Sequence, residues 1–136
     1  MRASLFLAAG AALLASSCST APGPQGRSAS AQRELDEALA GRVAGAPLRC
    51  IPSYRADQMQ IIDDWTILYR DGRTVYVQTP RGGCPGIANR SNTLVVNFRG
   101  GSELCDGQIN ELVDLSSGIH GGACVFGPFV PYTRPR

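Results

Sequence analysis

The sequence predicts a mainly β fold, a small disulfide-stapled β-barrel or sandwich preceded by a short helix. Short runs rich in branched and aromatic residues recur between Leu48 and Tyr132. Glycine, proline and aspartate interrupt these runs about every 8–12 residues, as is typical of all-β domains. One interruption, Asp71-Gly72, is the strongest hairpin signal in the chain. Four cysteines fall in the same region, an even number that indicates disulfides in an exported protein.

The N-terminus has the layout of a bacterial signal peptide. Arg2 supplies a positive charge, Leu5–Leu14 is apolar, and small residues lead to Cys18. The apolar run is shorter than the ~20 residues that a membrane-spanning helix needs. A cysteine at the cut site resembles the lipobox of bacterial lipoproteins, so we expect residues 1–17 to be a lipoprotein signal peptide and Cys18 to be lipidated. A cleaved signal peptide without a lipid, which would give a soluble periplasmic protein, is the alternative.

Residues 18–46 are expected to form a flexible linker that contains a short helix near residues 32–43. The first part of this segment is rich in serine, alanine, glycine and proline, a composition that cannot bury a core. Leu35, Leu39 and Val43 follow at intervals of four, which places them on one helical face. The helix is short enough to be marginal unless it packs on the domain.

Residues 47–136 are expected to form one small β domain. The apolar residues of Gln108–Leu115 fit helical spacing and also fit a strand, so this segment stays open between the two. The runs that predict strands are Leu48–Ile51, Gln58–Ile62, Trp65–Arg70, Thr74–Gln78, Thr93–Phe98 and a bent final strand at Cys124–Tyr132.

The hairpin around Asp71-Gly72 is predicted to be covered on both faces. A two-residue type I′ loop at this position pairs Arg70 with Arg73 and Leu68 with Val75. Successive side chains point to opposite faces, and both faces of these two strands carry large apolar groups. We therefore expect the closing sheet on one side and loops or the preceding helix on the other.

The four cysteines of the domain are Cys50, Cys84, Cys105 and Cys124. They allow three disulfide pairings. We expect Cys84–Cys105, which brackets a strand and its turn, and Cys50–Cys124, which would join the first strand to the last. A zinc site built from all four thiolates is the alternative, but it usually needs paired short spacings, and the intervening segments here have 33, 20 and 18 residues.

Several motifs follow one another between residues 39 and 131: Leu39–Gly45, Cys50-Ile51, Ile62–Tyr69, Cys84–Ile87, Cys105–Gly107 and Cys124–Pro131. In order and spacing they resemble an uncharacterised family of Gram-negative bacterial envelope proteins known only as a domain of unknown function. The resemblance covers about residues 39–132. The resemblance implies a secreted or lipid-anchored domain. It implies no activity, because none is established for that family. In the lipoproteins that the N-terminus resembles, Ser19 in place of an aspartate after the cysteine favours export to the outer membrane.

The charge pattern argues against a nucleic-acid partner. All 13 basic residues are arginines, and they are scattered along the chain without a run or stripe. A nucleic-acid surface normally gathers positive charge on one face. No cofactor is expected from the sequence.

Two groups of residues are candidates for ligand binding. His120 is the single histidine and could act as a general base, or as a metal ligand together with Asp114. The chain lacks the G-x-S-x-G and H-E-x-x-H motifs, so an ordinary loop histidine is the favoured interpretation. Trp65, Tyr69 and Tyr76 could form an aromatic binding platform, although a buried core face is the favoured interpretation.

The adjacent carboxylates Asp63 and Asp64 could hold calcium together with Asp71. Neighbouring strand residues point to opposite faces, so we expect these aspartates to be turn residues. The pairs Gly82-Gly83 and Gly121-Gly122 could form anion-binding nests, with flexible turns as the default interpretation.

The expected function is therefore that of a lipid-anchored periplasmic domain at the outer membrane, a non-enzymatic interaction module of the cell envelope. Its expected partners are the membrane, through the lipid, and an envelope protein. The alternative is a small-ligand or metal-binding module that uses the aromatic hairpin face and the loop around His120. A hydrolase with an unrecognised site is the third hypothesis.

Overall fold

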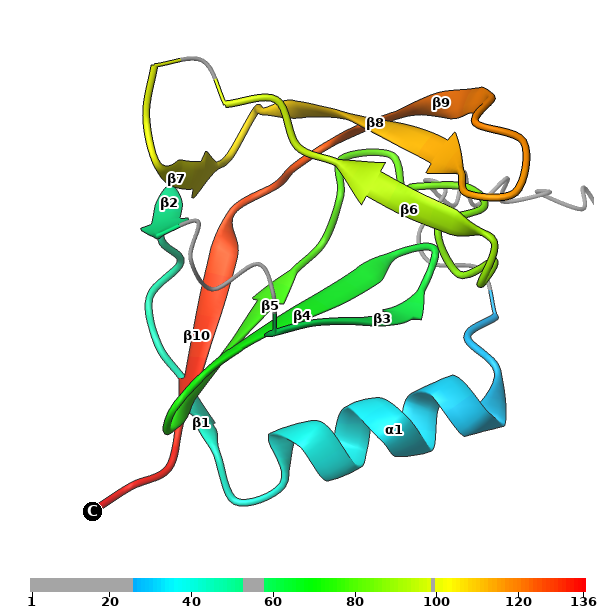
Figure 1. The fold of residues 1–136 in the computed structure, drawn as a ribbon. Coiled ribbons are helices and arrows are strands. Elements are labelled where there is room, and N and C mark those ends of the chain that lie inside the picture. Colours follow the sequence, from blue (N-terminus) through cyan, green and yellow to red (C-terminus); the bar gives the residue numbers. More distant parts are fainter. Residues whose placement is uncertain (1–25, 53–57, 99) are drawn as a thin grey trace, which may run out of the picture.

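The computed structural model describes residues 26–52, 58–98 and 100–136, and it shows a helix packed on a β-sandwich (Figure 1). The predicted signal peptide and Cys18 lie outside the described residues. The elements are α1 (Ala29–Leu39), β1 (Val43–Ala44), β2 (Cys50–Pro52), β3 (Met59–Asp63), β4 (Thr66–Asp71), β5 (Thr74–Gln78), β6 (Asn92–Val95), β7 (Glu103–Cys105), β8 (Ile109–Asp114), β9 (His120–Val125) and β10 (Phe129–Thr133).

The strands form three sheets, which confirms the predicted fold class as a sandwich that does not close into a barrel. The largest sheet has the order β1-β10-β5-β4-β3. The sheet β6-β8-β9 lies across its inner face, and the pair β2-β7 joins the two at one side (Figure 1). Neighbouring strands within each sheet are antiparallel. Among the described residues, no helix has the length and apolar character needed to cross a membrane.

Helix α1 lies earlier in the chain than the sequence predicted. The Ser28 hydroxyl caps its first turn by accepting a hydrogen bond from the Ala31 amide at 3.1 Å. The helix ends at Leu39, and Gly41 follows with φ of 66°, a conformation that glycine adopts without strain. Val43 consequently lies in β1, paired with Thr133 of the last strand, and not on the helix. The packed unit therefore includes α1 and β1, upstream of the expected domain start at residue 47.

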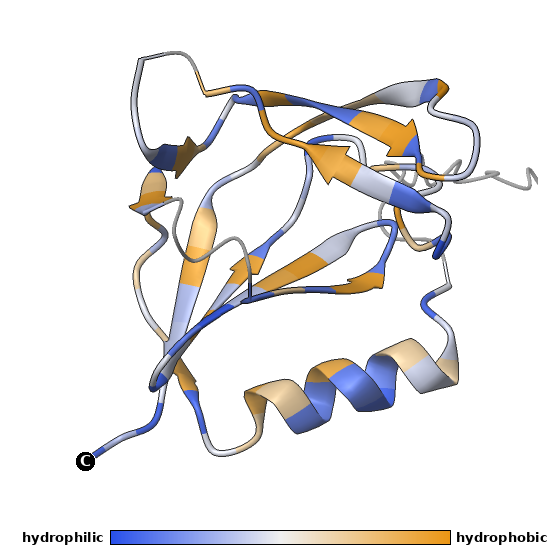
Figure 2. Cartoon of the chain, viewed as in Figure 1, coloured by the Kyte–Doolittle hydropathy of each residue, from blue (hydrophilic) through white to orange (hydrophobic). Residues whose placement is uncertain are grey.

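The prediction that both faces of the β4–β5 hairpin are covered is confirmed. On the outer face, Ala31 and Ala38 of α1 pack against Ile62, Leu68 and Val75. Leu68 and Val75 are 0% and 1% exposed, so the helix seals this side. Figure 2 shows the apolar residues of α1 on the side that faces the sheet.

The inner face of the hairpin meets the second sheet in the main core. Ring centroids of Tyr69, Phe126 and Phe129 lie 5.8–6.4 Å apart in edge or tilted contacts. Ile51 of β2 and Leu104 of β7 belong to the same cluster, so the small third sheet is anchored in this core.

The two-residue hairpin loop lies one residue later in the chain than predicted. The structure pairs Asp71 with Thr74 and Leu68 with Val77, which leaves Gly72 and Arg73 in the loop. Only Gly72 has a positive φ, 52°, as in a type II′ turn, whereas a type I′ loop at Asp71-Gly72 would force a positive φ on the aspartate. The faces of the strands were nevertheless predicted correctly, because this change moves each pairing by two residues.

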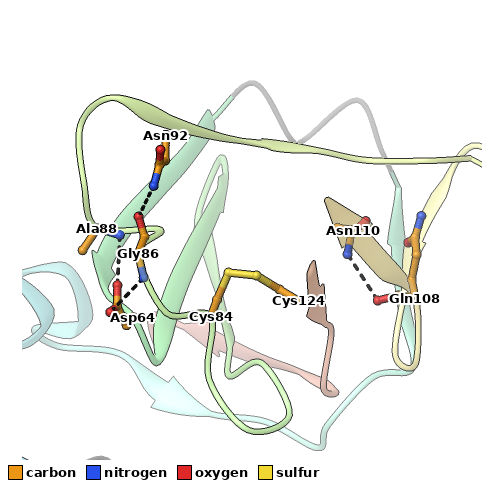
Figure 3. Close-up of a disulfide and its surroundings, with 8 residues drawn as sticks. All are labelled: Asp64, Cys84, Gly86, Ala88, Asn92, Gln108, Asn110 and Cys124. Atoms are coloured by element: carbon orange, nitrogen blue, oxygen red, sulfur yellow. Dashed lines mark hydrogen bonds between the residues drawn. A yellow bond between two sulfur atoms is a disulfide. The ribbon is translucent and has the colours of Figure 1, made fainter. Parts of the chain in front are cut away.

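The predicted disulfide pairing is wrong. The bonds join Cys50 to Cys105 and Cys84 to Cys124. Cys50 and Cys105 are directly opposed on β2 and β7, so the bond runs across that strand pair. Cys84, in the loop after β5, is bonded to β9 across the core (Figure 3). The thiolates are therefore not available for the alternative four-cysteine zinc site.

In the C-terminal third of the chain, the described secondary-structure elements are strands joined by turns and loops. The segment left open between helix and strand is β8, which pairs with β6 on one side and β9 on the other. The expected final strand is divided into β9 and β10, which belong to different sheets. Gly127 sits at the crossing, where a Cβ would collide with the backbone oxygen of Thr79. The bend therefore requires glycine.

Candidate functional site

One face of the sheet β6-β8-β9 is left uncovered by the rest of the described chain. Leu94, Asn110, Leu112 and Cys124 point into the core and are 0–9% exposed. Alternation places their neighbours on the opposite side. We call this side the outer sheet face and define it by Thr93, Val95, Ile109, Glu111, Val113, His120, Ala123 and Val125. Val95 and Ile109 are 39% and 62% exposed, so the face presents apolar side chains to solvent.

His120 and Glu111 form a cross-strand pair on this face. The imidazole Nδ1 lies 2.8 Å from a carboxylate oxygen of Glu111, and the two side chains are 67% and 43% exposed. The pairing of Val113 with His120 and of Glu111 with Ala123 brings the two side chains together from adjacent strands. His120 therefore lies in β9 and not in the predicted loop. Sequence reasoning missed Glu111, because its role depends on treating Ile109–Asp114 as a strand.

An open cleft of about 660 Å³ adjoins the outer sheet face. It shares Ile109 and Glu111 with that face, and the carboxylates of Glu103 and Asp106 also line it. Asp106 receives two hydrogen bonds from Nη2 of the Arg81 guanidinium, at 2.7 and 2.9 Å, and is thereby held in place. The lining of the cleft is therefore mainly polar and acidic, with the apolar side chain of Ile109 on the β8 side.

The aromatic residues considered as a binding platform do not face this site, and the favoured interpretation as a core face fits the two tyrosines. Tyr69 is 1% exposed and lies in the core, where burial raises the pKa of its phenol above the ordinary value. Tyr76 is half-buried and packs against the same cluster. Trp65 lies in the turn between β3 and β4, with its ring against Gly83. The inward-facing tyrosines and the outward-facing His120 are thus on opposite sides of the β6-β8-β9 sheet.

The adjacent aspartates hold local structure, as the turn interpretation predicts. Asp63 accepts a hydrogen bond from the Trp65 amide at 2.8 Å and forms an ion pair with Arg27. The two Asp64 carboxylate oxygens accept hydrogen bonds from the Gly86 and Ala88 amides, both at 3.1 Å (Figure 3). The carboxylate of Asp64 thereby fixes the loop that carries Cys84.

The three-aspartate calcium hypothesis does not match this geometry. Asp71 ends β4, whereas Asp63 and Asp64 precede its start. The six-residue strand therefore separates Asp71 from the other two carboxylates.

His120 and Asp114, considered above as a possible metal pair, each bind another partner, and that of His120 is Glu111. Asp114 accepts hydrogen bonds from Ser116 and Ser117 at the tip of the β8–β9 hairpin. The Ser116 hydroxyl is the main cause of a lowered Asp114 pKa, and backbone amides add to the effect. Within the described ranges, the cluster of metal-ligating side chains is Cys50, Glu103 and Cys105, and its two sulfurs form a disulfide.

The two glycine pairs have different surroundings. Gly121 and Gly122 lie within β9 and are strand residues. Gly82 and Gly83 both have positive φ, 77° and 79°, and the Gly83 amide donates to the Pro80 carbonyl at 3.0 Å. One amide of the Gly82-Gly83 pair is therefore already engaged within the loop.

No family model, curated protein or solved structure matches the chain.

Proposed function

We propose that the chain is a lipid-anchored, non-enzymatic interaction module of the cell envelope that binds a partner protein through the outer sheet face. The observation that carries this proposal is the contrast between the two sheets. The large sheet is covered on one side by α1 and on the other by the core. The outer sheet face has no such cover within the described residues, and it exposes Val95 and Ile109.

The chemistry of the face suits a protein partner. Burial of exposed apolar surface contributes about 25 cal/mol per Å², so Val95 and Ile109 would supply affinity. Glu103 and Glu111 lie along the adjoining cleft, which favours a partner whose apolar patch is flanked by basic side chains, while the Asp106 carboxylate there is already paired with Arg81. The edge strand β9 exposes Gly121 to Ala123, whose small side chains let another backbone approach.

The proposed location rests on the N-terminal sequence. The apolar run and Cys18 have the arrangement of a lipoprotein signal, and the resemblance to an envelope family agrees with it. Stable anchoring needs two or more acyl chains, and lipoproteins of the kind resembled carry three. The intact mass of protein purified from membranes tests this: a triacylated Cys18 is expected, and an unmodified residue there would contradict the anchor.

The interaction is tested by site-directed photo-crosslinking in cells that express the full chain. A crosslinking amino acid at Val95 or Ile109 is expected to capture the same partner. Arg33 is a matched control, because it is exposed on α1, and α1 packs on the side of the large sheet that is turned away from β6-β8-β9 (Figure 1). Capture of the same proteins from Arg33, or no reproducible product from Val95 and Ile109, would contradict the proposal.

The cleft supports a second candidate function, the binding of a small ligand. Its volume of about 660 Å³ is within the range of ligand pockets. A ligand at 100 times its Kd adds ~2.7 kcal/mol of stability. A thermal-shift screen therefore tests the candidate, and a Glu111→Gln variant should lose the shift of any hit that binds in the cleft.

A further inference from the structure

We propose that the Cys50–Cys105 disulfide is a thiol-exchange site, open in the folded protein to small thiols that are neutral or cationic. The other disulfide, Cys84–Cys124, is closed to them. The two bonds differ in surroundings, in the effect of breaking them and in nearby charge. None of these differences depends on whether the outer sheet face binds a partner protein.

The first difference is access. Cys84 and Cys124 are 0% and 2% exposed and belong to the main core. Cys50 and Cys105 are half-buried, and Cys105 lines the open cleft. Exchange requires a thiolate to approach a disulfide sulfur, so access decides which bond reacts.

The second difference is what holds the surrounding strands when the bond breaks. β2 and β7 pair with each other over three residue positions, including the cysteines themselves. Ile51 and Leu104, the central pair, are 1% and 0% exposed and lie in the main core. These two side chains keep the strands in place after reduction, so the Cys50–Cys105 bond can open without unfolding of the domain.

The third difference is charge. A carboxylate oxygen of Glu103 and the sulfurs of Cys50 and Cys105 all lie within 4.8 Å of one another. A negative charge at this distance repels an approaching anion. Thiols that carry an additional negative charge are therefore disfavoured relative to neutral or cationic ones.

The exchange consists of two displacements. The thiolate of a small thiol attacks one cysteine sulfur, a mixed disulfide forms, and the other cysteine leaves as a thiolate that takes a proton from water. A second small thiol attacks the sulfur of the first, forming a small-molecule disulfide and releasing the second cysteine thiol. Two small thiols are oxidised and one protein disulfide is reduced. A mixed disulfide at Cys105 would place the added group in the cleft, where it would change the candidate ligand site.

The test uses the full chain with both disulfides formed, in native buffer. The protein is incubated with cysteamine, which is cationic, or with 2-mercaptoethanesulfonate, which is anionic. The reaction is quenched with acid, and free cysteines are then alkylated and assigned by peptide mass spectrometry. Labelling of Cys50 and Cys105 is expected while Cys84 and Cys124 stay protected, with faster reaction for cysteamine after correction for thiolate concentration.

Two variants separate access from charge. Glu103→Gln is expected to accelerate the reaction of the anionic thiol several-fold and to leave that of cysteamine unchanged or slower. Glu111→Gln is the matched control, because it removes a carboxylate from the same cleft that is not part of the Cys50–Glu103–Cys105 cluster. Simultaneous labelling of all four cysteines, labelling only on unfolding, or an equal response to the two variants would overturn the proposal.

Discussion

Replacing Gln78 with methionine is expected to stabilise the protein, although it removes a polar residue from the middle of a sheet. Gln78 lies on β5, between Ile67 and Phe129 of the neighbouring strands, and is 0% exposed. Among the described residues, neither its amide nitrogen nor its amide oxygen has a hydrogen-bond partner. Methionine has a similar length and no polar group that needs a partner.

The magnitude follows from the cost of burying unpaired polar groups. An unsatisfied buried donor or acceptor costs about 1–3 kcal/mol. Gln78 contributes two such atoms, and adapting the packing to a new side chain returns part of the gain. We therefore expect Gln78→Met to raise the free energy of unfolding by about 1–3 kcal/mol.

Gln108→Met is the matched control with the opposite sign. The Gln108 amide accepts a hydrogen bond from the Cys105 amide and donates one to the Asn97 carbonyl, both at 3.1 Å. A typical hydrogen bond contributes about 0.5–1.5 kcal/mol, so this variant should lose about 1–2 kcal/mol. The same substitution thus stabilises at one glutamine and destabilises at the other.

Urea denaturation followed by tryptophan fluorescence and circular dichroism gives both free energies, with an equal m-value expected for all three proteins. For a domain of this size, 1 kcal/mol corresponds to a Tm change of about 4–8 °C. A loss of more than about 1 kcal/mol for Gln78→Met would refute the reasoning, because it would show that the amide forms stabilising hydrogen bonds in the folded protein.

Three further predictions test the fold by urea denaturation. Gly127→Ala should lower the free energy of unfolding by about 1–3 kcal/mol or more, since the added methyl group meets the backbone of Thr79. Gly101→Ala, where a Cβ has open space, should change it little. Equal effects of the two variants would contradict the close approach of the chain at Gly127. Leu68→Ala should lower the free energy of unfolding by about 2–5 kcal/mol. Ile109→Ala, at an exposed position, should change it by less than about 0.5 kcal/mol. A Leu68→Ala variant as stable as the wild type would show that α1 does not pack there. Hydrogen bonds lower the pKa of Asp114, so the contribution of this carboxylate to stability is present above the ordinary pKa of 3.8 and is lost as the pH falls through the lower folded pKa. Asp114→Asn should therefore lose less stability on acidification than the wild type. Parallel curves of unfolding free energy against pH for the two proteins would contradict this.

The faces of the hairpin followed from the sequence because they depend on local geometry. Alternate side chains of a strand point to opposite sides, so Leu68 and Tyr69 had to be buried in different cores if both were buried. That result survived an error in the loop, since moving the pairing by two residues preserves the faces. Which residues formed the loop depended on the φ of Gly72 and Asp71, and the Asp-Gly motif pointed to the wrong turn type.

The disulfide pairing could not be predicted, because it depends on which strands are neighbours. The expectation that the first strand lies beside the last was partly right: β1 pairs with β10, and Leu48 bridges to Phe129. The chain then leaves that sheet, and two residues later Cys50 is opposite Cys105. Pairing between segments far apart in sequence has no local pattern, so spacing alone could not identify it.

The candidate site was likewise predictable in part from the sequence. His120 could be identified as a candidate from the sequence, because it is the single histidine and its side chain can act as a base or a ligand. Its partner Glu111 is defined only by the register of β8 and β9, and the exposure of Val95 and Ile109 depends on α1 covering the other sheet and not this one. The sequence by itself determined the β content, the two-sided hairpin and the cysteine count, because these are set by neighbouring residues. Only the tertiary structure decided the cysteine partners and the uncovered face, because these depend on how distant segments pack.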